Sequence, residues 1–123
     1  MRRHLTCPEA IAALRRGKVV EQLLALEPHN HEPVVRWLSV SSRGGAFGVT
    51  LHLVHDPCDP TFLDLSEFAP VNEDEDVGEG TEAGRAADPE EALHIATQLG
   101  AASERWVNEF VVAEEYRDAH GWS

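Results

Sequence analysis

Two apolar segments separated by a glycine turn constrain the fold of this chain more than any other feature. The first, "VVRWLSVS" (34–41), is rich in β-branched and aromatic residues, and the second, "AFGVTLHLVH" (46–55), alternates large apolar residues with smaller or polar ones. Between them lies "SRGG", which is typical of a tight turn. Because alternation places apolar side chains on one face of a strand, the pattern predicts an antiparallel β-hairpin.

The residues after this hairpin predict a third strand. "DPCDP" (56–60) contains two prolines, which cannot donate to a sheet ladder, so this segment is expected to turn the chain. "TFLDLSEF" (61–68) then has the composition of a strand. An antiparallel meander of three strands is the simplest topology that accommodates all three segments.

Helix signals lie on both sides of the predicted sheet. Thr6 followed by Glu9 has the spacing of a capping box, so a helix is expected to begin near Cys7. In "DPEEALHIATQLG" (88–100), the aspartate, proline and final glycine occupy positions typical of a helix N-cap, first turn and C-terminal end. The sequence therefore predicts an N-terminal helix and a second helix near 88–100.

Two further segments leave a choice between helix and strand. "KVVEQLLAL" (18–26) fits a short helix best, but its two valines leave a strand open. The stretch that starts at Ser103 spaces apolar residues at helical intervals, although 106–113 could equally contain a short strand. Both segments are interpreted as helices.

A length of 123 residues is typical of one domain that buries its own core. We therefore expect a single α+β domain over residues 1–123, in which a small three-stranded antiparallel sheet packs against N- and C-terminal helices on one face. The segment from about 69 to 87 has many charges and no periodic apolar residues, so it is expected to form a long, mobile acidic loop.

The charge of the chain is concentrated in and around this loop. The net charge is −12, and residues 67–91 alone hold ten carboxylates against Arg85, a net charge of −9. The first 26 residues carry the opposite sign, with a net charge of +3. Because an acidic chain is repelled by a phosphate backbone, nucleic acid is not expected as a partner.

"VNEDEDVGEGTEAG" (71–84) invites comparison with an acidic calcium loop, but its spacing does not fit one. Such a loop needs oxygen ligands at positions 1, 3 and 5, a glycine at 6 and a glutamate at 12. Counting from Asn72 places Val77 at position 6 and Ala83 at position 12. Counting from Asp74 places Arg85 at position 12. The stretch is therefore interpreted as an electrostatic feature.

A partner-binding surface is the function that this charge favours. The predicted site consists of six carboxylates: Glu73, Asp74, Glu75, Asp76, Glu79 and Glu82. Charge of one sign steers the encounter with a partner of the opposite sign. The sequence thus favours a small acidic cytosolic protein that engages a basic protein, such as an inhibitor or immunity protein that mimics a polyanion. A loop whose charge only keeps the chain soluble explains the same composition.

A metal site is the alternative. Imidazole, carboxylate and thiolate groups are ligands of zinc and other transition metals. His52 and His55 are three residues apart on a predicted strand and should point to opposite faces, so only one of them can join a shared site. The candidate ligands of a metal-binding protein or metal-dependent enzyme are His29, His31, His55, Asp56 and Cys58.

Other classes of function find no support in the motifs. The chain has no GxSxG elbow, no phosphate-binding glycine loop and no CxxC pair, so we predict no catalytic residue and no cofactor, and an enzyme is not expected. No apolar run approaches the roughly 20 residues that span a bilayer, and the basic start lacks the apolar run of a signal peptide. We therefore expect a cytoplasmic protein without a membrane partner. Nine arginines against the single Lys18 fit the codon bias of a GC-rich bacterial genome.

Overall fold

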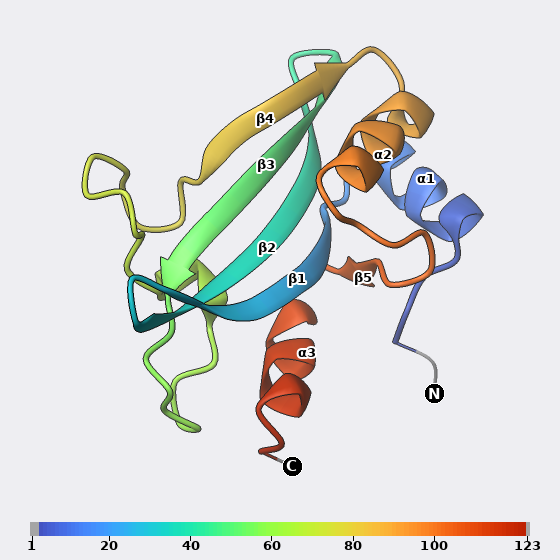
Figure 1. Ribbon diagram of the computed structural model, residues 1–123. Helices are drawn as coiled ribbons and strands as arrows, with labels where there is room; N and C mark the ends of the chain where they lie inside the picture. The colour runs from blue at the N-terminus through green and yellow to red at the C-terminus, as the bar shows by residue number, and fades with distance from the viewer. Residues whose placement is uncertain (1–2, 123) are drawn as a thin grey trace.

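The computed structural model describes residues 3–122, apart from the side chain of His29. Its centre is a five-stranded antiparallel sheet with the strand order β4-β3-β2-β1-β5 (Figure 1). The strands are β1 (Val20–His29), β2 (Glu32–Arg43), β3 (Ala46–His55), β4 (Thr81–Ala86) and β5 (Val107–Asn108).

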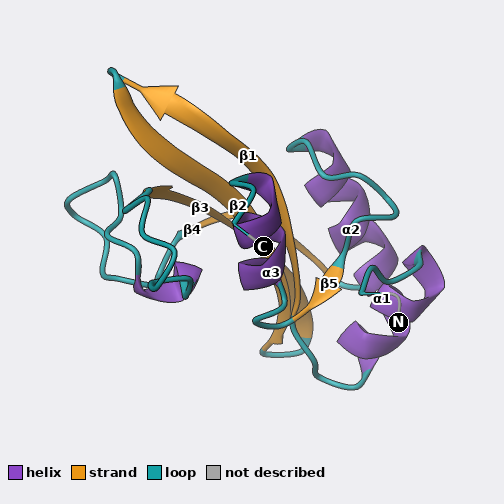
Figure 2. Cartoon of the chain, turned by 90° about the horizontal axis from the view of Figure 1, so that it is seen from below, coloured by secondary structure: helices purple, strands orange, loops and turns teal. Residues whose placement is uncertain are grey.

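Helical elements cover both faces of this sheet. They are α1 (Cys7–Arg15), the 3-10 helix η1 (Leu65–Glu67), α2 (Pro89–Gln98) and α3 (Val112–Ala119). Figure 2 shows α1 and α2 together on one side of the sheet, with the turn that contains η1 on the other side. Over residues 3–122, no helix has the length and apolar character needed to cross a membrane.

Alternation along β2 divides the hydrophobic core into two clusters. Leu38 and Val40 belong to the cluster that includes α1 and α2, whereas Val35 and Trp37 belong to the cluster that includes α3 and η1. All four side chains are at most 3% exposed. Burying an apolar side chain of this size is worth roughly 1.5–3 kcal/mol, so both faces of the central strand stabilise the fold.

Several predicted elements are confirmed. Helix α1 begins after Thr6, and both bonds of the capping box are present, with Glu9 N donating to Thr6 Oγ1 and Thr6 N donating to Glu9 Oε1. Helix α2 begins after Asp88, whose side chain accepts a hydrogen bond from Glu91 N. The hairpin of β2 and β3 turns at the predicted glycines, Gly44 and Gly45, both of which have positive φ.

The expected three-stranded sheet is wrong, and the first reason is that residues 18–26 contribute a strand rather than a helix. Strand β1 pairs with β2 along its whole length. The register shifts between Leu23 and Ala25, so Leu24 is an extra residue in a β-bulge. This bulge interrupts the alternation and explains why the apolar pattern fits a helix. The adjacent valines at 19 and 20 suit the strand.

The second reason is that residues 61–68 are not a strand. Asp59 Oδ1 accepts hydrogen bonds from the backbone N and the hydroxyl of Thr61, and Asp64 Oδ1 accepts the same pair from Ser66. Local bonds from side chain to backbone compete with a sheet ladder and fold the segment into turns. Phe68 thereby reaches the cluster that contains α3.

The third reason is that the expected acidic loop over 69–87 ends in strand β4, which lies on the edge of the sheet beside β3. The sequence "TEAGRA" has few strand-favouring residues, so packing decides its conformation. Gly84 lies against α2, and a Cβ at this position would be 2.6 Å from Ile95 Cγ2. Only glycine permits this close approach of strand and helix.

The C-terminal stretch contains both a strand and a helix, the two structures between which its sequence did not decide. Val107 and Asn108 add β5 beside β1, and α3 begins only at Val112. Phe110 separates the two elements, because its φ of 74° lies in the left-handed region. Since α3 belongs to the second hydrophobic cluster, the N- and C-terminal helices do not share one face of the sheet, contrary to expectation.

Replacing Gly84 by alanine should destabilise the fold by about 1–3 kcal/mol, because the new methyl group would overlap Ile95 Cγ2. Urea denaturation measures the loss. Ala83→Ser, at the exposed neighbouring position, is the control and should change stability by less than about 0.5 kcal/mol. In the background of Ile95→Ala, the cost of Gly84→Ala should largely disappear. Equal costs in both backgrounds would show that the close approach is not what requires glycine.

Candidate functional site

The predicted partner-binding carboxylates lie on two tight turns and the start of β4; we call residues 73–82 the acidic segment. Asn72 Oδ1 accepts from Asp74 N at 3.0 Å, and Glu75 Oε2 accepts from the hydroxyl of Thr81 at 3.0 Å. Glu79 Oε1 accepts from Asp76 N at 3.2 Å. These bonds give the segment a defined conformation, which its composition alone did not predict.

The charges of the acidic segment point mainly to solvent. Glu82 forms a two-pronged hydrogen-bonded ion pair with Arg85, at 3.0 and 3.1 Å, which lowers the pKa of the Glu82 carboxyl. Glu73, Asp74 and Asp76 are exposed and have no cationic partner within the described part of the chain. The structure thus brings all six predicted carboxylates into one stretch of surface but neutralises only one of them.

The five predicted metal ligands do not converge on one point. His31 is exposed in the turn between β1 and β2, and the side chain of His29 lies outside the described residues. His55 lies 3.7 Å from Glu32 and contributes to no group of potential ligands within residues 3–122. Asp56 and Cys58 do come together, and the third member of their group is His120, which the sequence did not suggest.

Asp56 is the centre of a buried hydrogen-bond network. Its Oδ1 accepts from Cys58 N at 2.8 Å and from the hydroxyl of Tyr116, and its Oδ2 contacts His120 Nε2 at 2.6 Å. The ring of Trp122 stacks on His120 with the ring centres 4.1 Å apart. The network therefore ties the loop after β3 to the C-terminal end of α3.

The electrostatics of this network favour a carboxylate and a neutral thiol. Burial by itself raises the pKa of Asp56, but the hydrogen bonds donated by Tyr116, the Cys58 amide and His120 lower it overall. Burial and the Asp56 charge raise the pKa of the Cys58 thiol. They also raise the pKa of the Tyr116 hydroxyl, which remains a hydrogen-bond donor. A thiol held neutral in this way is not an activated nucleophile.

Helical spacing could have identified the missing members of this network. Tyr116 and His120 are four residues apart, so a helix over this segment places them on one face. Their partner could not be deduced, because Asp56 is 60 residues from Tyr116 in the sequence.

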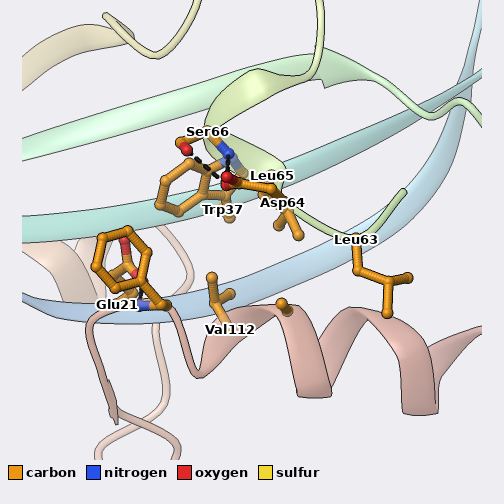
Figure 3. Close-up of a pocket in the computed structure, with 9 residues that line it drawn as sticks. Glu21, Trp37, Leu63, Asp64, Leu65, Ser66 and Val112 are labelled. Atoms are coloured by element: carbon orange, nitrogen blue, oxygen red, sulfur yellow. Dashed lines mark hydrogen bonds between the residues drawn. The ribbon is translucent and has the colours of Figure 1, made fainter. Parts of the chain in front are cut away.

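A concave region lies on the face of the sheet that α3 and η1 cover only in part. Two adjoining hollows of about 330 and 190 Å³ share the side chains of Glu21, Trp37, Ser66 and Phe110. We call them together the sheet-face cleft. Figure 3 shows the larger hollow, with Glu21 and Trp37 projecting from strands β1 and β2 and Val112 projecting from α3. The turn that contains Asp64, Leu65 and Ser66 forms the opposite wall.

Glu21 is a buried carboxyl in this cleft. Its side chain is 6% exposed, and its Oε1 accepts a hydrogen bond from Phe110 N at 2.7 Å. Burial, with smaller contributions from the charges of Glu109 and Asp64, raises the pKa of Glu21 to about 7. The bond to Phe110 holds that residue in its left-handed conformation, in which Phe110 is 66% exposed at the cleft.

The polar end of the cleft contains a neutral histidine. His52 stacks on Trp37 with the ring centres 3.9 Å apart, and its Nε2 lies 3.1 Å from the hydroxyl of Ser39. Burial lowers the pKa of His52 to about 4. Trp37 Nε1 is buried and has no hydrogen-bond partner among residues 3–122.

The sequence contains one signal for Glu21. If residues 18–26 are interpreted as a strand, Glu21 is a charged residue on the face of the strand that points into the protein.

Comparison with known proteins finds no matching family model, no similar curated protein and no similar solved structure. The acidic segment, the Asp56 network and the sheet-face cleft are therefore the features that bear on function.

The free energy of unfolding should depend on the ionisation of Glu21. Because its pKa is raised from 4.5 to about 7 in the folded chain, its contribution to stability is fully present below about pH 4.5 and is lost as the pH rises through about 7. Glu21→Gln should lack this loss, so relative to wild type it should gain about 2–3 kcal/mol across that interval. Urea denaturation over this pH range measures the difference.

His52 has the opposite effect on the free energy of unfolding. Because its pKa is lowered in the folded chain, its contribution to stability is lost as the pH falls. It is present in both proteins and cancels in the comparison. Glu104→Gln, at an exposed position whose charge does not affect the pKa of Glu21, should retain the pH dependence of wild type. Parallel pH profiles for wild type and Glu21→Gln would contradict the raised pKa.

Proposed function

We propose that this chain is a small cytoplasmic binding protein that engages a basic protein through its acidic segment. The observation that carries the proposal is uncompensated charge, since Glu73, Asp74 and Asp76 are exposed without a cationic partner in the described residues. Exposed charges of one sign raise the rate of encounter with an oppositely charged surface. An inhibitor or immunity protein directed against a cationic enzyme needs such a negatively charged surface.

The shape of the molecule supports this proposal. In Figure 1, the loop that precedes β4 extends from the sheet on the side far from α1 and α2. The basic residues at the end of α1 and directly after it, namely Arg15, Arg16 and Lys18, are therefore separated from the acidic segment. A basic partner can approach the acidic segment without meeting them.

An exposed apolar residue lies within the same surface. Val77 is 54% exposed between Asp76 and Gly78. Protein interfaces combine an apolar centre with a charged rim, and a solubilising loop has no need of the apolar contact. The acidic segment offers both.

Reversal of three charges tests the proposal. Glu73→Lys, Asp74→Lys and Asp76→Lys together should weaken binding of the natural basic partner by about a hundredfold or more, because each contact changes from attraction to repulsion. The partner is identified by affinity purification from the source organism with wild-type protein and mass spectrometry. Isothermal titration calorimetry with the purified partner then measures the dissociation constants.

The matched control has the same change in net charge at other exposed positions: Glu91→Lys, Glu104→Lys and Glu114→Lys. It should retain most of the affinity. If the two triple variants lose affinity equally, the effect comes from net charge alone and the acidic segment is not the binding surface. Full affinity of the first variant would remove the proposal.

A metal-binding function is the second candidate, and one observation favours it. Asp56, Cys58 and His120 offer an oxygen, a sulfur and a nitrogen ligand within 4.8 Å of one another. A hollow of about 350 Å³ lined by Asp56 and His120 also reaches His31. Zinc binds all three ligand types, but it would have to displace the proton between His120 Nε2 and Asp56 and remove the proton of Cys58.

Titration with zinc alone tests this candidate. Zinc at neutral pH should raise the melting temperature of wild type, and the rise should be absent in Cys58→Ser and in His120→Asn. His55→Asn, which removes a histidine outside the group, should respond like wild type. An unchanged melting temperature of wild type, or an equal rise in all four proteins, would dismiss the site.

A further inference from the structure

The sheet-face cleft contains a carboxyl and two aromatic residues that neither proposed function uses. Its larger hollow, of about 330 Å³, has walls of Leu63 and Leu65 from the turn that contains η1 and of Val112 and Ala113 from α3. A concave, mainly apolar hollow of about this size with a few polar groups is the usual form of a site for a small molecule. The polar groups decide which molecule fits.

Glu21 determines which charge an occupant of the cleft should carry. One of its oxygens accepts from Phe110 N, and the other has no hydrogen-bond partner in the described residues. A buried carboxyl needs either a proton or a cation, because an isolated buried charge is costly. An ammonium group in the cleft would provide both a positive charge and hydrogen-bond donors.

The surrounding charges favour a cation as well. Asp64 lies at the start of η1, Glu109 follows β5, and Glu79 of the acidic segment lines the adjoining hollow. Arg43 also lines that hollow, and Arg16 and Lys18 line a neighbouring hollow with Glu109 and Phe110, whereas His52 is neutral at physiological pH. The residues that α3 contributes to the cleft, Val112 and Ala113, carry no charge. The charges that act on the Glu21 carboxyl are those of Glu109 and Asp64, and both are negative, which disfavours an anionic occupant.

Phe110 and Trp37 provide aromatic surface for the rest of the occupant. Phe110 is held at φ 74°, a conformation that costs a bulky residue of order 1–3 kcal/mol and that is concentrated at functional sites. The hydrogen bond to Glu21 maintains this conformation, and Phe110 lies beside Glu21 and outside both core clusters. Trp37 lines both hollows of the cleft beside Glu21.

We propose that the sheet-face cleft binds a small organic amine, in which a protonated nitrogen pairs with Glu21 and an apolar or aromatic body lies among Trp37, Phe110 and the apolar walls. Neither the acidic-segment proposal nor the metal candidate requires this site, because Glu73, Asp74, Asp76 and the Asp56 network do not line it.

Three probes of similar shape but different charge test the proposal: 2-phenylethylamine, 2-phenylethanol and 3-phenylpropionate. The amine should shift the NMR signals of the Trp37 indole and the Phe110 amide and should bind at least about tenfold more tightly than the alcohol. The carboxylate should not bind measurably. Below about pH 7, calorimetry in two buffers should detect a proton released from Glu21 when the amine binds.

Two variants locate the contact. Glu21→Gln keeps an oxygen to accept from Phe110 N but removes the charge, so the preference for amine over alcohol should fall to about one. Phe110→Ala, at an exposed position, should weaken both neutral and cationic probes. Glu104→Gln, an exposed carboxylate outside the cleft, should bind like wild type. Equal binding of amine and alcohol by wild type, amine binding unchanged in Glu21→Gln, or signal shifts outside the cleft would overturn the proposal.

Discussion

The structure depends on β2 being buried on both of its faces. Its even-numbered residues Leu38 and Val40 pack toward α1 and α2, and its odd-numbered residues Val35 and Trp37 pack toward α3 and η1. A sheet used in this way needs cover on two sides. On one side, two helices of 9 and 10 residues form the cover. On the other, an eight-residue helix and a three-residue turn cover only part of the face, and the uncovered part is the sheet-face cleft.

Local signals in the sequence were sufficient for the parts of the fold that local bonds determine. The capping box at Thr6, the N-cap at Asp88 and the glycine turn after Arg43 all appear as predicted, because each rests on contacts within a few residues. The α+β class follows from these elements. The number of strands does not follow from local signals. The β-bulge at Leu24 interrupts the strand alternation of β1, and β4 depends on the close packing of Gly84 against Ile95.

The candidate sites show the same division between local and distant contacts. The acidic segment is contiguous in the chain, so its six carboxylates could be named in advance. The Asp56 group combines residues 60 or more positions apart, and only Asp56 and Cys58 were anticipated. A helix over residues 18–26 places Glu21 on its exposed side, where a glutamate is common, so the helix prediction gives no reason to single out Glu21. As a strand residue opposite Ser39, it points into the second core.

Three acidic side chains are buried within residues 3–122, and all three hold the C-terminal part of the chain. Glu21 accepts from Phe110 N just before α3 begins, Asp56 accepts from Tyr116 and contacts His120 near its end, and Glu115 in its middle pairs with Arg3, His4 and Arg105. Buried carboxylates are costly unless they are paired, so their positions fix where α3 can dock.

The three carboxylates differ in how far partners within the chain satisfy their oxygens and their charge. Glu115 faces two arginines, and Asp56 uses both of its oxygens, so each is satisfied within the chain. Glu21 has only a backbone amide, and burial raises its pKa to about 7, which places it near the midpoint between acid and anion at physiological pH. Of the three, Glu21 is the one that lines the sheet-face cleft with one oxygen unpaired among residues 3–122. The carboxyl that anchors the start of α3 through Phe110 is therefore the same one that an occupant of the cleft would contact.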